Sequence, residues 1–252
     1  MSAYSLQGKV AVITGSGKNI GRATALRLAE AGCRIVVNGR SDSQAVDEVV
    51  SHIRASGGEA CPVMADVSQQ ADVTRLIDKS VEAFGGVDIV VSNAGLRRQT
   101  PFLTMDYSEW REILSVALDG AFLLARAAAP LMVSRGGGTI IGVSGISTHV
   151  GTANRCHVSA SKAGLEGLMR ALAVELGPQN ITCNTIAPGA IDTIRGAAAG
   201  GPSPRSLADA NVPLGRKGDV EEIAAMVEYL AGPTGRYITG QTLHVNGGAY
   251  LT

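Results

Sequence analysis

The segment from Lys9 to Gly32, KVAVITGSGKNIGRATALRLAEAG, decides the fold. Its first residues form a short apolar run rich in β-branched side chains, which is typical of a strand buried on both faces. The glycine-rich stretch from Gly15 to Gly21 predicts a tight turn, and a helical pattern follows until Gly32 ends it. A helix start presents unpaired N–H groups, and glycines let a phosphate approach the backbone. The segment therefore predicts a cradle for the pyrophosphate of a dinucleotide.

Length, charge and cysteine content narrow the class of protein. A chain of 252 residues suits one α/β domain, and 22 acidic and 22 basic residues balance, so we expect no nucleic-acid partner. The N-terminal residues do not resemble a signal peptide and no apolar run approaches membrane-spanning length, so we expect a cytoplasmic protein without a membrane partner. The cysteines are far apart and lack metal-ligand spacing, which favours free thiols and predicts no metal site; they are Cys33, Cys61, Cys156 and Cys183.

The rest of the chain alternates between strand and helix patterns. Such alternation implies right-handed crossovers and a parallel sheet that is covered on both faces. We therefore predict an α/β fold, a single doubly wound Rossmann-type domain over residues 1–252 with roughly seven strands. The further strands are expected at 33–39, 59–67, 87–95, 137–145, 181–189 and 241–248, and the further helices at 40–58, 69–86, 107–134, 154–176 and 218–232.

One segment interrupts this rhythm after the sixth strand. Residues 195–211, RGAAAGGPSPRSLADAN, are rich in small residues and show no clear periodicity. A long loop at this place is either a lid over the site or a disordered insertion. Ligands of open parallel sheets bind beyond the carboxyl ends of the strands, so the position of the loop favours a substrate lid over residues 192–212.

Five motifs occur in an order that resembles the short-chain dehydrogenase/reductase family, and the likeness covers nearly the whole chain. They are TGSGKNIG (14–21), SNAG (92–95), SASKAG (159–164), IAPGAIDT (186–193) and YITGQTLHVNGG (237–248). The last motif and PLGR (213–216) are most similar to the 3-oxoacyl carrier-protein reductase branch. The resemblance implies one doubly wound domain, a small-molecule substrate and a homotetramer.

The resemblance also implies a cofactor site along the strand ends. The middle glycine of the family's turn is replaced by Asn19, which tolerates a positive φ better than other non-glycine residues do. By this likeness the cofactor-binding residues are Gly15, Asn19, Ile20, Gly21, Asp66, Val67, Asn93, Ala94, Gly95, Lys162, Pro188, Gly189, Ile191 and Thr193.

Charge predicts which dinucleotide is bound. A ribose 2′-hydroxyl is usually held by an acid at the end of the second strand, whereas a 2′-phosphate needs cations. Here that strand ends in Asn38, Gly39 and Arg40 without an acid, and Lys18 lies in the glycine turn. Because Arg and Lys can both hold a phosphate, we predict that NADP(H) is preferred over NAD(H). The alternative is that both side chains are ordinary surface cations.

The catalytic positions depart from the family. Its members use a Tyr four residues before a Lys to exchange the proton with the substrate oxygen, together with a Ser and an Asn. Lys162 is present here, but the Tyr position holds Val158. The Ser position falls on Gly145, and the Asn position falls on Ala117. Only the Lys remains, so the family's mechanism does not transfer directly.

Three accounts of the site are open. In the first, an oxidoreductase acts on a carbonyl or alcohol with a non-standard proton donor, and Ser144 and His157 join Lys162 as catalytic residues. His157 has a suitable pKa range for this role, but a regular helix turns it away from the face that carries Lys162. In the second, a lyase or hydrolase reuses the fold, with His149, His157 or Arg155 as acid or electrostatic groups. In the third, the chain is a catalytically silent nucleotide-binding partner subunit.

The expected edge of the site is basic. Arg97 and Arg98 directly follow SNAG, Arg155 lies three residues before Val158, and His149 follows the fifth strand. Clustered cations attract anions and can hold a carboxylate or phosphate, so we predict a small acidic substrate bound by Arg97, His149 and Arg155. The alternative is that these are solvated loop charges. By the family likeness, residues 166–170 are expected on a helix–helix interface.

Overall fold

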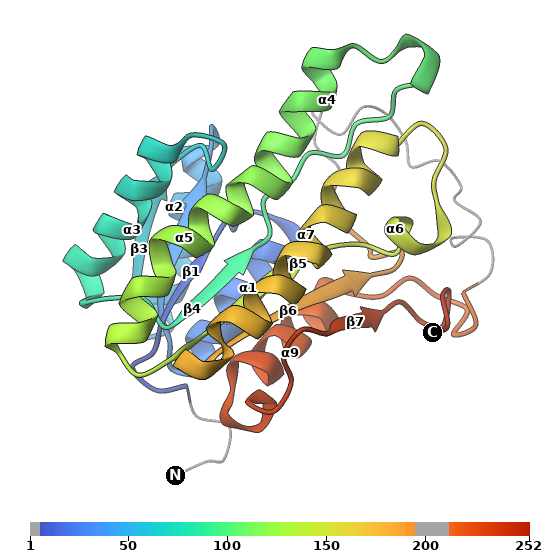
Figure 1. Ribbon diagram of the computed structural model, residues 1–252. Helices are drawn as coiled ribbons and strands as arrows, with labels where there is room; N and C mark the ends of the chain where they lie inside the picture. Colours follow the sequence, from blue (N-terminus) through green and yellow to red (C-terminus); the bar gives the residue numbers. More distant parts are fainter. Residues whose placement is uncertain (1–5, 195–211) are drawn as a thin grey trace.

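Seven strands form one parallel sheet in the computed structural model, which describes residues 6–194 and 212–252 (Figure 1). The strand order is β3-β2-β1-β4-β5-β6-β7, so the chain winds outward from β1 in one direction and from β4 in the other. The predicted doubly wound Rossmann-type fold is therefore confirmed. The strands are β1 (Val10–Ile13), β2 (Arg34–Gly39), β3 (Ala60–Met64), β4 (Ile89–Ser92), β5 (Gly138–Val143), β6 (Ile181–Pro188) and β7 (Thr242–Val245).

Helices connect the strands and begin and end close to the predicted residues. Gly32, with a φ of +95°, follows α1, and a reciprocal capping box of Asp219 and Glu222 starts α9. The short α6 and the 3₁₀ turn η1 (Phe102–Thr104) were not predicted from the sequence. The α-helices are α1 (Asn19–Glu30), α2 (Ser43–Ala55), α3 (Gln70–Phe84), α4 (Tyr107–Leu114), α5 (Gly120–Ser134), α6 (Ser147–Val150), α7 (Cys156–Leu176) and α9 (Val220–Ala231).

The core has two layers because alternate residues of each strand face opposite sides of the sheet. Ile13 of β1 belongs to a buried cluster that includes Leu28 of α1 and Val227 of α9. Val12, its neighbour in β1, belongs to a second cluster that includes Leu76 of α3 and side chains of α5 and α7. Each such buried aliphatic side chain stabilises the fold by about 1.5–3 kcal/mol. Burial on both faces explains the continuous apolar runs of the strands.

One long helix departs from expectation. The segments α4, the π-helical turn η2 (Ser115–Asp119) and α5 run on as a helix of 28 residues. Its length and composition would allow it to cross a membrane, so the expectation that no apolar segment approaches that length is wrong. Its apolar character has a packing reason, because Leu124 and Met132 are fully buried in the second cluster, and α5 packs against α3, β4 and β5.

Candidate functional site

The glycine turn lies at the carboxyl end of β1 and is too close-packed for larger residues. Gly15 has a φ of +62°, and a Cβ added to Gly21 would lie 2.4 Å from the Gly15 oxygen. The Asn93 side chain, at the end of β4, donates to the Thr14 oxygen at 2.9 Å and to the Gly15 oxygen at 3.1 Å. The Ala94 N–H also bonds the Thr14 hydroxyl, at 3.1 Å. The tightly held turn therefore leads directly into the start of α1, where the N–H groups that a pyrophosphate requires are found.

Asn19 begins α1 with a φ of 50°, which confirms that an asparagine can take the conformation of the replaced glycine. Its side chain also reaches across the strand ends. Asn19 Nδ2 donates to the Ile194 oxygen at 2.9 Å, and the Ile194 N–H donates to Asn19 Oδ1 at 2.9 Å. This two-point contact fastens the segment after β6 to the glycine turn. Of the expected lid, residues 195–211 lie outside the described residues.

The two cations expected at the 2′-phosphate each lie beside an acid. Lys18 Nζ is 2.6 Å from Asp42 Oδ2, and Arg40 Nη1 is 3.9 Å from Asp66 Oδ2. Asp42 also caps α2 by accepting the Ala45 N–H at 3.0 Å. The hydrogen bond from Lys18, followed by the bond from Ala45, holds the pKa of Asp42 below its usual value. Asp42 is a neighbour of the expected phosphate site that sequence reasoning missed.

Four of the other expected cofactor residues, Val67, Pro188, Gly189 and Ile191, lie at or just after the ends of β3 and β6. Val67 is buried against α5, where a Cβ added to Gly120 would lie 3.1 Å from the Val67 oxygen. Pro188 ends β6, and Gly189 donates its N–H to the Val245 oxygen at 2.9 Å. Ile191 forms a parallel bridge with Gly218. The ends of β1, β4, β5 and β6 thus meet at one edge of the sheet, where ligands of such folds bind.

Lys162 lies on α7 at the same edge, half-buried. Its Nζ donates to the Val143 oxygen at the end of β5 at 2.5 Å, and a Cβ added to Gly95 would lie 3.4 Å from this nitrogen. Among the described residues, no carboxylate forms an ion pair with Lys162. Burial, with a smaller contribution from the Arg97 charge, lowers the pKa of Lys162 to about 7. The amine therefore exists in both protonation states near neutral pH.

The positions around Lys162 that bear polar groups in the family are apolar or empty here. Val158, one turn earlier on α7, is 6% exposed and has no proton to give. A Cβ added to Gly145 would meet only the Ser147 hydroxyl, at 3.8 Å, so the space beside Gly145 is open. Ala117 is buried inside the π-helical turn. None of these three residues can take part in proton transfer.

Ser144, a candidate catalytic residue, is directed to a buried acid instead. Its hydroxyl donates to Glu166 Oε1 at 2.5 Å, and the same oxygen accepts the Thr148 hydroxyl at 3.1 Å. His149 Nε2 lies 3.2 Å from this oxygen. Glu166 stands one turn after Lys162 on α7 and is 4% exposed. It was expected on a helix–helix interface, but it is instead the internal anchor of the loop after β5.

His157, the other candidate for proton transfer, is fully buried on a different face of α7. Its Nε2 lies 3.3 Å from Glu109 Oε1, and that oxygen also accepts the Thr100 hydroxyl at 2.6 Å. The bond from Thr100 holds the pKa of Glu109 below its usual value, with a smaller effect from His157. On the regular helix α7, the spacing of five residues turns His157 away from the face that carries Lys162, and its ring contacts Glu109 instead.

The expected substrate-binding cations lie on different segments, after β4, on α6 and before α7. Arg98 makes two hydrogen bonds to Glu112, one of them at 3.0 Å, which hold it against α4. The charge of Arg97 contributes to the lowered pKa of Lys162. Arg155 is half-buried at the residue before α7. His149 lies on α6 with its ring stacked on Tyr250, at 5.0 Å between centroids.

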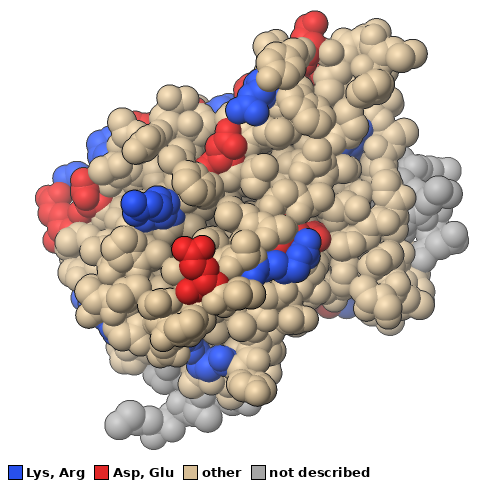
Figure 2. Space-filling view, viewed as in Figure 1, with Lys and Arg blue, Asp and Glu red and all other residues tan. Residues whose placement is uncertain are grey.

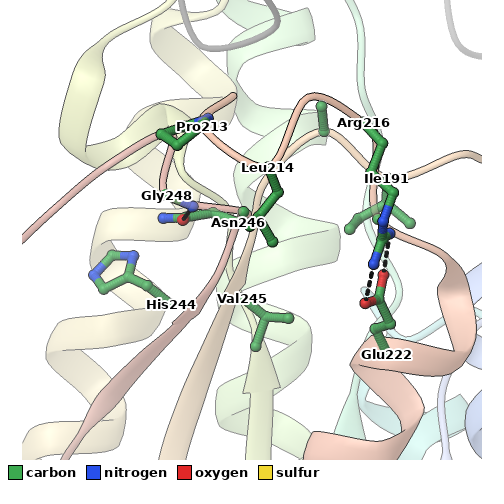
Figure 3. Close-up of a pocket in the computed structure, with 12 residues that line it drawn as sticks. Ile191, Pro213, Leu214, Arg216, Glu222, His244, Val245, Asn246 and Gly248 are labelled. Carbon is green, nitrogen blue, oxygen red and sulfur yellow. Dashed lines mark hydrogen bonds and ion pairs between the residues drawn. The ribbon is translucent and has the colours of Figure 1, made fainter. Parts of the chain in front are cut away.

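A cavity of about 430 Å³ lies beside this site, beyond the ends of β6 and β7 (Figure 3). The paired side chains of Arg216 and Glu222 lie on one side of it, with their nearest atoms 2.8 Å apart, and His244 lies on the other. His244 also contacts His149 edge to face, at 4.6 Å between ring centroids. Burial, and then the His149 charge, lowers the pKa of His244. This cavity was not predicted from the sequence, although the PLGR and NGG motifs border it.

The sheet order and the glycine turn after the central strand β1 define a Rossmann-type α/β protein. Comparison with known proteins narrows this class. A family model described as enoyl-(acyl carrier protein) reductase matches residues 15–250. A 3-oxoacyl-(acyl-carrier-protein) reductase from Synechocystis is 37% identical over 248 residues, which cover 98% of this chain and 99% of the relative. The chain belongs to the short-chain dehydrogenase/reductase family.

Two solved structures share the fold over nearly the whole chain. A dehydrogenase/reductase from Sinorhizobium meliloti has a TM-score of 0.90 and 33% identity, and the match covers 99% of this chain and 98% of the other. A 7α-hydroxysteroid dehydrogenase, solved with NADH and 7-oxo glycochenodeoxycholic acid, has a TM-score of 0.89 and 31% identity. That match covers 98% of this chain and 96% of the other. The relatives are thus reductases and dehydrogenases, one of them with a bound nicotinamide dinucleotide.

Proposed function

We propose that this protein is an NADP(H)-dependent oxidoreductase that acts on a carbonyl or alcohol group of a small acidic substrate, with Lys162 as the proton-transferring residue. The observation that carries the proposal is the position of the Lys162 amine. It lies at the carboxyl edge of the sheet, bonded to the Val143 oxygen, with a pKa lowered to about 7. The other candidate donors, Ser144 and His157, are directed to Glu166 and Glu109.

A nicotinamide dinucleotide, when bound, supplies or accepts the hydride. In carbonyl reduction, the Lys162 ammonium gives a proton to the carbonyl oxygen, and in alcohol oxidation the neutral amine takes the proton from the hydroxyl. A group with a pKa near the working pH is best suited to such transfer. The Val143 carbonyl keeps the amine at the edge of the sheet in either direction.

The glycine turn supports the cofactor assignment. Gly15 and Gly21 allow the turn to pack tightly at the start of α1, and the first turn of α1 has no acid to repel phosphate oxygens. Lys18 and Arg40 would meet a 2′-phosphate, which favours NADP(H) over NAD(H). Both cations are already beside acids, so a phosphate would share Lys18 with Asp42 and Arg40 with Asp66.

The substrate assignment depends on Arg97. Its charge acts on the Lys162 amine, so Arg97 would attract an acidic substrate toward this residue. Arg98 is held against α4 by its two hydrogen bonds to Glu112. His149, about one-fifth exposed and held by Glu166, and Arg155 complete the set of cations at this edge.

We also propose self-association, with a homotetramer as the expected state. Figure 2 shows a mainly uncharged surface over α5 and α7, seen from the side of Figure 1. Phe122 of α5 is 52% exposed and Val174 of α7 is 81% exposed. Apolar side chains in such positions favour burial against another copy of the chain. Light scattering coupled to size exclusion tests this, and a monomer at micromolar concentration would contradict it.

The decisive experiment follows NADPH absorbance in the presence of small 2- and 3-oxo acids and their uncharged esters. We expect oxidation of NADPH with at least one acid, and a Lys162→Met variant slower by about 10²–10⁴-fold. Lys79→Met, at an exposed lysine paired with Glu82, is the matched control and should keep the parent rate. Full activity of Lys162→Met would contradict the assigned role.

The same experiment separates the other two accounts of the site. A lyase or hydrolase would convert the acid without net oxidation of NADPH, which product analysis would show. A silent partner subunit would bind the nucleotide and convert nothing. Val158 and Gly145 stand at the positions where the family has hydroxyl side chains. Because these hydroxyl groups are absent, the two alternatives remain open.

A further inference from the structure

The surroundings of Lys162 favour a neutral amine. The side chain is half-buried, it donates to an uncharged carbonyl oxygen, and among the described residues it has no carboxylate partner that would stabilise its charge. Arg97 adds a second positive charge nearby. Desolvation and a neighbouring cation are the two conditions that convert a lysine into a nucleophile toward carbonyl compounds.

Two glycines near the amine leave out side chains that would otherwise fill the space around it. Gly95 presents no side chain toward Nζ, and a Cβ added there would contact this nitrogen at 3.4 Å. Gly145, two residues after the carbonyl that holds the amine, borders open space. Val158 occupies the turn before Lys162 with an apolar side chain that cannot hydrogen-bond to the amine or to a carbonyl. A small molecule that reached Nζ would thus meet few polar groups that compete with it.

We infer that Lys162 forms an imine with small oxo acids, so that this site can activate a carbonyl compound without a redox step. The amine nitrogen adds to the carbonyl carbon, and the carbonyl electron pair moves to the oxygen. Both amine hydrogens then leave with that oxygen as water, and the C=N bond forms. No oxidant or reductant is consumed. The inference goes beyond the oxidoreductase proposed above and does not depend on it.

The substrate class follows from the neighbouring charge. A 2- or 3-oxo acid carries a carboxylate close to the carbonyl carbon that Lys162 attacks. Arg97 is the cation whose charge lowers the pKa of that amine, and an arginine can bind a carboxylate. Arg98, held by Glu112, provides the matched comparison on the adjacent residue. A neutral aldehyde should react with the same amine but gain nothing from Arg97.

Reductive trapping tests the inference on the full, unmodified chain. The protein is incubated with pyruvate and sodium cyanoborohydride, and the modified peptides are identified by mass spectrometry. We expect the adduct on Lys162 to form at least about tenfold faster than on any other lysine. The four others, all with exposed side chains, are internal controls: Lys9, Lys18, Lys79 and Lys217. Equal labelling of all five, or an unmodified Lys162, would overturn the inference.

Two variants test the part played by Arg97. Arg97→Gln should slow the trapping of pyruvate on Lys162 by about three- to tenfold, with a smaller effect on propanal, whereas Arg98→Gln should change neither. Equal effects of the two variants would overturn the assignment of Arg97.

Failure of this inference differs from failure of the proposed function. Trapping without NADPH oxidation supports the imine alone, and NADPH oxidation without trapping supports the oxidoreductase alone.

Discussion

The Ser144 hydroxyl donates a 2.5 Å hydrogen bond to the buried Glu166 carboxylate and thereby joins the end of β5 to the middle of α7. The same carboxylate oxygen contacts Thr148 and His149, so one acid anchors residues 144–149 of the loop that precedes α7. The loop backbone is held from the other side, where the Ile146 N–H donates to the Pro188 oxygen at 3.0 Å. This loop forms one wall of the site, and its position depends on a residue that no motif contains.

We predict that Glu166→Leu destabilises the fold by about 2–4 kcal/mol, because it leaves buried hydroxyl and imidazole groups without their acceptor. Glu166→Gln, which keeps one acceptor oxygen, should cost about half as much. Urea denaturation measures both, and Glu175→Leu at an exposed position of α7 is the control. A Leu variant within about 0.5 kcal/mol of the parent would show that the anchor is unimportant.

A second prediction concerns Lys162 and the pH dependence of stability. The pKa of this group is about 7 in the folded chain and 10.5 in an ordinary lysine, so between these values the unfolded chain binds a proton that the folded chain does not. Its contribution to the free energy of unfolding therefore rises with pH across this window. Lys162→Met removes the cost of burying the charge and should stabilise the protein at pH 7 by about 1–3 kcal/mol.

Thermal unfolding at a series of pH values checks this sign. The advantage of Lys162→Met over the parent should shrink as the pH rises toward 10.5. Lys79→Met is the control, because Glu82 raises the pKa of that exposed lysine rather than lowering it. A constant difference between Lys162→Met and the parent over this range would contradict the lowered pKa.

The rate of carbonyl reduction should follow the same group. The ammonium form of Lys162 gives the proton, so kcat/KM for reduction should be level below pH 7 and fall about tenfold per pH unit above it. Alcohol oxidation needs the neutral amine and should fall as the pH drops below 7. A reduction rate that rises with pH in this range would point to a different proton donor.

The fold was predictable because its signals are local. Apolar β-branched runs, glycine stops and helical periods each extend over a few residues, and the burial of β1 on both faces matches the continuous run that predicted it. The replaced glycine was also correctly interpreted, since Asn19 adopts the positive φ that the turn needs. The apolar character of residues 107–134 was underestimated. Buried core helices and membrane helices share that composition, so composition alone does not separate them.

The candidate site was less predictable, because its contacts join residues far apart in the chain. Glu166 and Ser144 are separated by 22 positions, and nothing in either local motif indicates that they meet. Asp42, the partner of Lys18, was likewise hidden in a helix cap. The helical period did show that His157 and Lys162 face different ways, and the contact of His157 with Glu109 agrees with that interpretation.

The last prediction concerns the charges around the adenosine end of the cofactor. Lys18→Ala and Arg40→Ala should each weaken NADP(H) binding by about tenfold and leave NAD(H) binding within about twofold, because only the former carries a 2′-phosphate. Asp42→Asn removes the acid that lies 2.6 Å from the Lys18 nitrogen and should tighten NADP(H) binding by about two- to fivefold. Lys9→Ala, at an exposed lysine beside Asp88, is the control.

Fluorescence titration with both cofactors measures these effects at low salt, and added salt should reduce them. Equal losses for NADP(H) and NAD(H) in the Lys18 and Arg40 variants would mean that neither cation meets a 2′-phosphate, and the preference would then have to arise elsewhere in the site.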